Sequence, residues 1–128
     1  MAAMSDFLEN ALINATLRNT TYTSPADVYV GLFTTDPTDD GSGTEVSGGS
    51  YVREIATFAA PSNGSSSTNA DVQFPQATAN WGTVTHFAIF DALSGGNMLY
   101  HGILTAAKTI ETGDVFKIAS GNLTVTLE

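Results

Sequence analysis

The sequence predicts a mainly β fold: an antiparallel β-sandwich, immunoglobulin-like or jelly-roll-like, with about seven strands and a short N-terminal amphipathic helix. Short segments rich in β-branched and aromatic residues recur along the chain, and clusters of Gly, Asn, Asp, Ser and Pro separate them. Apolar residues at helical spacing occur near the N-terminus. A chain of 128 residues is therefore expected to form one domain over residues 1–128.

The helix is expected over residues 5–18. Ser5 is a suitable N-cap, and the apolar residues after it form one stripe along the helix. A helix of this length is marginally stable alone, so it needs a surface to lie against. Two packing surfaces are possible from the sequence: the helix lies on its own sheet, or it docks on a neighbouring subunit.

The central element is a β-hairpin. Two apolar runs, Thr83–Phe90 and Met98–Leu104, flank the turn formers Ser94-Gly95-Gly96-Asn97. Neither face of the first run is cleanly polar, so this strand is expected to be covered on both faces. The segments 36–50 and 61–69 are rich in turn formers and are expected to be loops, the first of them exposed and outside the core. The remaining strands are expected at residues 27–35, 51–58, 72–74, 115–119 and 123–127.

The composition excludes several classes of function. The formal net charge is −9, and the four basic residues are scattered along the chain. A basic stripe is needed to bind nucleic acid, and basic clusters are needed to dock on anionic membranes, so neither partner is expected. No run approaches the ~20 apolar residues of a membrane span. The chain contains no Cys, which excludes disulfides, a thiolate nucleophile and Cys-ligated zinc.

One acidic loop contains weak candidates for metal ligands. Asp36, Asp39, Asp40 and Glu45 offer the hard oxygen ligands that calcium prefers. The EF-hand pattern does not fit, because Thr38 and Ser47 occupy two of its ligand positions. A solvated acidic loop is the favoured interpretation, and no metal or cofactor is expected.

The two histidines form no recognisable catalytic set. Counting outward from the turn places His86 opposite about Thr105 and His101 opposite about Phe90, so the two rings should not lie side by side. A general base also needs a positioned partner, and neither has one at motif spacing. The protein is therefore not expected to be an enzyme.

The aromatic residues favour structural roles. Trp81, Tyr100 and Tyr51 are candidates for a sugar-stacking surface, but aromatics in a small sandwich are more often core or interface residues. We expect the interface residues to include Phe7, Leu8, Leu12, Phe87, Phe90, Trp81 and Tyr100.

Three strings resemble a family of small virion structural proteins of tailed bacteriophages, whose members are often labelled tail fibre proteins. They are WGTVTHFAIFDALSGGNMLYHG at Trp81–Gly102, VYVGLFTTDP at Val28–Pro37 and GTEVSGGSY at Gly43–Tyr51. Similar small β-sandwich proteins serve as capsid cement or decoration proteins. The resemblance implies a virion component, assembled in the host cytoplasm, and no catalytic residues.

The absence of a sequence repeat favours the cement role over a fibre shaft. A shaft needs a repeating element, and this chain has neither heptads nor a regular β-repeat. In the cement role the expected partner is the major capsid protein, and the chain would bind on the outside of the head at joints between capsid subunits. The cement proteins that this chain resembles commonly form trimers, so a trimer is expected. Two alternatives stay open: a tail, baseplate or tail-fibre module, and a receptor-glycan binding module.

Overall fold

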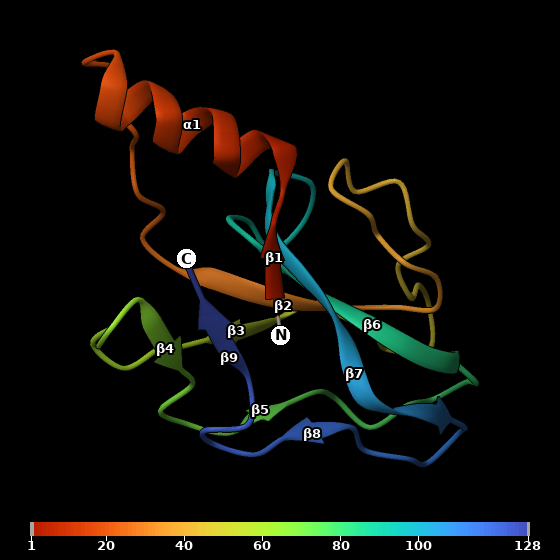
Figure 1. Ribbon diagram of the computed structural model, residues 1–128. Helices are drawn as coiled ribbons and strands as arrows, with labels where there is room; N and C mark the ends of the chain where they lie inside the picture. Colours follow the sequence, from red (N-terminus) through yellow and green to blue (C-terminus); the bar gives the residue numbers. More distant parts are fainter. Residues whose placement is uncertain (1, 128) are drawn as a thin grey trace.

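A computed structural model describes residues 2–127. The main sheet is antiparallel, with five strands in the order β1–β7–β6–β2–β3. Two small sheets pair β4 with β9 and β5 with β8, and α1 projects from one end of the molecule (Figure 1). The elements are β1 Ala2–Met4, α1 Asp6–Leu17, β2 Val28–Phe33, β3 Glu54–Ala56, β4 Ser65–Ser67, β5 Val72–Gln73, β6 Gly82–Phe90, β7 Met98–Ile110, β8 Lys117–Ile118 and β9 Thr124–Thr126.

The predicted mainly β antiparallel fold with a short N-terminal helix is confirmed. The described chain has nine strands, because β1 and β4 form in segments expected to be irregular. β1 adds to the free edge of β7, where Ala2 pairs with Gly102. The serines of β4 pair with β9, and the hydroxyls of Ser65 and Thr126 lie 3.1 Å apart. Both strands are short, and their conformation comes from a distant partner rather than from local apolar pattern.

The main core lies between one face of the main sheet and the two small sheets. Val30, Leu32 and Val84 from the main sheet are fully buried there, together with Phe74 beside β5. Burial of such side chains is the chief stabilising contribution, at ~25 cal/mol per Å² of apolar surface. No helix among residues 2–127 is long and apolar enough to cross a membrane.

The opposite face of the main sheet is also covered. Phe33, Ala88, Phe90 and Met98 form a smaller buried cluster there, so the prediction that the first hairpin strand is covered on both faces is confirmed. Two residues of the loop at residues 36–50 are buried: Pro37, and Val46, which joins the main core. The expectation that this loop is wholly exposed was wrong, because it brings its own apolar side chains.

The hairpin of β6 and β7 is confirmed, but its register differs from the expected one. Val84 pairs with Lys108 while His86 pairs with Ile103, so residues 104–107 lie opposite Thr85 alone. A second register shift lies between Ile89 and Phe90. His86 therefore faces Ile103 rather than about Thr105.

His101 is displaced in the same direction. It pairs with Ala88 rather than lying opposite about Phe90, because the connection between β6 and β7 spans residues 91–97 and is wider than the four-residue turn assumed. The bulge at Thr85 also places Val84 on the same face as Phe87, and both enter the main core.

Candidate interaction surfaces

The N-terminus of α1 is anchored tightly to the main sheet. The Ser5 hydroxyl donates to the Met98 carbonyl at 2.5 Å and accepts from the Leu8 amide at 3.2 Å. The Ser5 amide donates to the Leu99 carbonyl at 2.9 Å, and Leu8 is the buried apolar residue of the helix. The remainder of the helix extends away from the body of the protein (Figure 1). α1 therefore behaves as an arm held at its base.

We expect Ser5→Ala to loosen this arm. The change removes the N-cap and leaves the Met98 carbonyl without its donor, so unfolding free energy should fall by about 1–2 kcal/mol. Amide hydrogen exchange over α1 should accelerate. Ser24→Ala, at an exposed serine in the loop after α1, is the matched control and should change neither quantity.

A charged clamp holds the acidic loop against the outer face of the main sheet. The Arg53 guanidinium donates to both carboxylate oxygens of Glu45, at 2.9 Å each, and lies 3.5 Å from the centroid of the Phe90 ring. It also donates to the carbonyls of Ala92 and Gly95, at 3.0 and 2.9 Å. One side chain, on the residue directly before β3, thus ties together the start of that strand, the loop at 36–50 and the hairpin loop.

Tyr51 completes the clamp from the side of the main core. Its hydroxyl donates to Glu45 at 2.6 Å and accepts from the Leu32 amide at 2.9 Å. Burial, and then the hydrogen bond to Glu45, raise the pKa of Tyr51, so the hydroxyl stays protonated and remains a donor. The Glu45 carboxylate is therefore held by the Tyr51 hydroxyl and the Arg53 guanidinium together.

The four acidic candidates for metal binding do not converge on one point. Asp36 accepts from the Thr38 amide at 2.9 Å, and Asp40 accepts from the Thr38 hydroxyl at 2.6 Å. That hydroxyl is the chief reason that the pKa of Asp40 is lowered. Glu45 binds Arg53, while Asp39 turns toward β7. Each carboxylate has its own protein partner.

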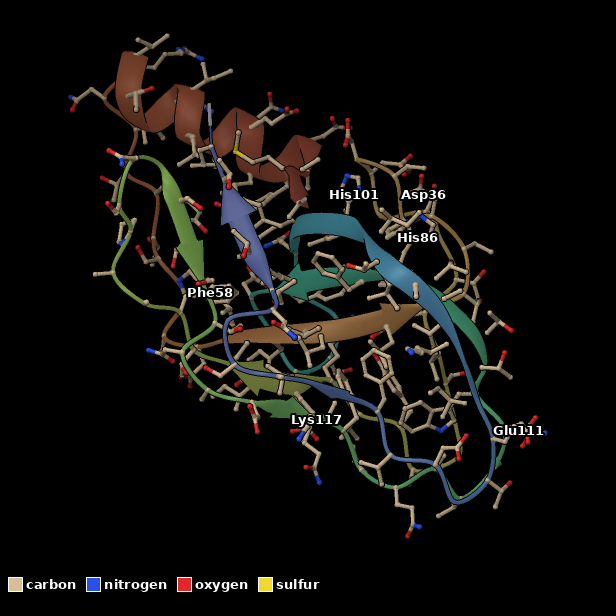
Figure 2. All side chains as sticks on the ribbon, turned by 60° about the horizontal axis from the view of Figure 1, so that its bottom comes forward. Asp36, Phe58, His86, His101, Glu111 and Lys117 are labelled. Carbon is tan, nitrogen blue, oxygen red and sulfur yellow. The ribbon has the colours of Figure 1, made fainter. Side chains whose placement is uncertain are left out.

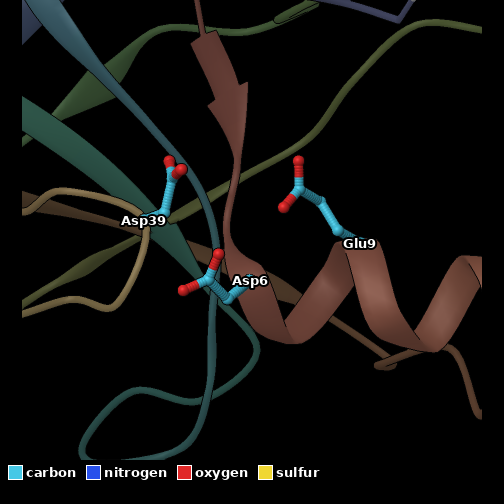
Figure 3. A group of neighbouring side chains, drawn as sticks. All are labelled: Asp6, Glu9 and Asp39. Atoms are coloured by element: carbon cyan, nitrogen blue, oxygen red, sulfur yellow. The ribbon is translucent and has the colours of Figure 1, made fainter.

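Asp39 instead approaches the first turn of α1. One oxygen each from Asp6, Glu9 and Asp39 lie within 4.8 Å of one another, and all three residues are exposed (Figure 3). The same Asp39 carboxylate lies 2.7 Å from His101 Nε2. Hard oxygen ligands of this kind suit a divalent cation. The positive end of the helix dipole also stabilises carboxylates at a helix N-terminus, and this needs no ion.

Both histidines are engaged within the protein. His86 Nδ1 lies 2.7 Å from the hydroxyl of the preceding Thr85, and His101 contacts Asp39 from the neighbouring strand. Figure 2 shows both histidines toward the same end of the molecule as Asp36, away from Lys117. Through Asp39, His101 ties the acidic loop to β7.

Most of the predicted interface residues lie inside their own chain. Leu8, Trp81, Phe87 and Phe90 are buried, so they present little surface to a partner. Their role at an interface stays a prediction, best supported for the residues that keep exposed area, which are Phe7, Leu12 and Tyr100.

Trp81 has no free face for stacking on a sugar. Its indole N–H donates to the Gly49 carbonyl at 2.9 Å, and Tyr51 packs edge-on at a centroid distance of 5.3 Å. Only 5% of Trp81 is exposed. The geometry therefore gives no support to a glycan site built on this residue.

Sequence reasoning missed three strongly exposed apolar side chains. Ile13 and Leu17 of α1 are 53% and 79% exposed, and Ile103 of β7 is 63% exposed. The sequence pattern of the helix could have revealed two of them, because Ile13 and Leu17 lie one turn apart on the side opposite the expected apolar stripe. Exposed apolar residues that gather on one face mark an interaction surface.

Two hollows open between the layers of the sandwich. One, of about 900 Å³, lies between the C-terminal half of β7 and the segment leading through β8 to β9. The second, of about 530 Å³, is lined mainly by apolar residues, among them Val28, Phe58 and Leu99. Burial raises the pKa of Tyr100, which lines the second hollow.

Comparisons with known proteins identify the family. No curated protein matches the chain. A family model described as podophage GP4 fiber I protein gp80 matches residues 3–126. The match spans nearly all of the sandwich together with α1. The chain therefore belongs to this family of tailed-phage virion fibre proteins and is a structural component of the virion.

Proposed function

We propose that this protein is a non-catalytic module of a virion fibre that works by holding neighbouring protein subunits together. The family match over residues 3–126 carries the proposal, because it covers the anchored arm and both layers of the sandwich as one unit. The arm and its exposed apolar residues support it further, since a surface of this kind suits contact with another protein.

The side-chain chemistry is consistent with a structural role. The groups that would serve as acid or base are paired within the fold, Glu45 with Arg53 and His101 with Asp39. The pairs close loops over the outer face of the main sheet. A protein that works by contact requires such rigidity rather than a reactive centre.

Location in the particle tests the proposal. An antibody fragment raised against the purified protein, bound to intact virions and imaged by electron microscopy, should mark fibres at the tail or neck. Labels spread over the head would contradict the fibre role. Virions incubated with an unrelated fragment are the control.

Capsid cement is the second candidate, favoured by the absence of the sequence repeat that a long shaft needs. In that role the protein would bind the major capsid protein, as a trimer, at joints on the outside of the head. The same imaging separates the two candidates. For cement, particles stripped of the protein should also release DNA at a lower temperature.

A further inference from the structure

The outward face of α1 combines acidic and apolar residues. At 3.6 residues per turn, Asp6, Glu9, Ile13 and Leu17 fall within an arc of about 80°. All four are exposed, whereas Leu8 on the other side of the helix is buried. This outward face is acidic near the base of the arm and apolar toward its tip.

The 900 Å³ groove is open and apolar in part, and its charged lining is two lysines and one carboxylate, Asp114, which accepts from the Glu111 amide at 2.8 Å. Its walls include Ile103 and Val115, which are 63% and 49% exposed, and both Lys108 and Lys117. These lysines are two of the four basic residues in a chain of net charge −9. Lys108 has no ion-pair partner within residues 2–127, and Lys117 has only Asp71, at 3.9 Å.

The bulge in β7 forms part of one wall of the groove. Residues 104–107 lie opposite the single residue Thr85, so this stretch bows away from β6. Among the described residues, β1 pairs with β7 from Tyr100 to Gly102. A groove of about 900 Å³ has room for a large element rather than for a single side chain.

Size and charge match the two surfaces. A 12-residue helix is about 18 Å long and about 10 Å across, so half of its cylinder occupies about 700 Å³, against a groove of about 900 Å³. Its carboxylates would meet lysines, and its Ile and Leu would meet exposed apolar walls.

The helix that fits the groove does not come from the same chain. No described residue of α1 lines it. α1 and β8, which forms part of one wall, lie at opposite ends of the molecule (Figure 1).

We propose that the outward face of α1 docks in the 900 Å³ groove of a second copy of this chain, giving a head-to-tail contact. Such a contact is heterologous, so it propagates into a ring or a filament. The inference deepens the proposed fibre function by naming the neighbour. Its test uses purified protein, so its failure would leave the location of the protein in the virion unaffected.

Site-specific cross-linking tests the contact directly, because the chain has no Cys of its own. Ile13→Cys and Val115→Cys proteins are mixed and treated with a short bismaleimide. The expected result is a linked dimer in the mixture and much less in either protein alone. Ile55→Cys, exposed on β3 at the far edge of the main sheet, replaces Ile13→Cys in the control mixture and should not link.

Charge reversal supplies a second readout, by sedimentation equilibrium. Lys108→Glu should lower the association constant about tenfold, and adding Glu9→Lys should restore most of it. The control is Lys108→Glu combined with Asp27→Lys, which restores the same net charge at an exposed residue outside α1. This second change should not restore the association constant. Three results would overturn the proposal: a monomer at every concentration, equal rescue by both second changes, or Ile13→Cys linking to itself as strongly as in the mixture.

Discussion

Replacing Arg53 by Met should lower the free energy of unfolding by about 3 kcal/mol, because it leaves the Glu45 carboxylate without its cation in a partly buried site. Arg53 and Glu45 side chains are 9% and 25% exposed. The change also removes the cation above Phe90 and the donors to two loop carbonyls, while the Met stem keeps much of the apolar packing. Urea unfolding followed by tryptophan fluorescence measures the loss.

The control for this change is Arg18→Met. Arg18 is exposed after α1, and its side-chain hydrogen bond to Asn14 is long at 3.5 Å. Its replacement should alter stability by less than about 0.5 kcal/mol. In a double-mutant cycle, Glu45→Gln should lower the free energy of unfolding much less in the Arg53→Met background than in the wild-type protein. Equal losses for the two arginines would refute the clamp.

The parts of the fold that follow from local pattern were predictable. Ser5 followed by apolar residues at helical spacing gave α1 with its N-cap, and alternating apolar residues gave β6 and β7 as a hairpin. The family resemblance rested on the same strings, and the family match confirms it.

The rest depends on contacts between distant segments. β1 reads Ala-Ala-Met and becomes a strand because β7 offers it a free edge. The bulge opposite Thr85 changes which residues face each histidine, and no local signal marks it. A sequence pattern likewise cannot show that Arg53 turns back to Glu45 and covers Phe90, since that contact forms only when the loop at 36–50 and the hairpin loop close on Arg53.

Of the two faces of α1, the sequence predicted the one that packs on the protein but not the exposed one, because exposure depends on contacts between distant segments. The expected stripe on α1 correctly identified the side that faces the protein, with Leu8 at its base. The exposed Ile13 and Leu17 stand out only once the helix is seen to extend away from the main sheet. Phe87 and Phe90 read equally well as interface or core, and burial within the chain distinguishes the two.

Phe74→Ala should produce the largest loss of stability, about 4 kcal/mol, because the ring is 1% exposed at the centre of the main core. It stacks on Tyr51 at a centroid distance of 6.1 Å and meets Phe116 edge-on at 5.8 Å. Removing it opens a cavity that the surrounding strands cannot close. Since single domains have unfolding free energies of about 5–15 kcal/mol, the loss should be plain as a lower urea midpoint.

The same chemical change at the surface isolates the contribution of burial. Phe7→Ala removes an identical ring from a site that is 41% exposed on α1, and at dilute protein it should cost under about 1 kcal/mol. Phe74→Leu, which refills most of the volume, should recover at least half of the loss. If Phe7→Ala and Phe74→Ala instead proved equally costly, the stability of the sandwich would not reside in the aromatic cluster, and the packing between the main sheet and the two small sheets would have to be looser than their buried contacts require.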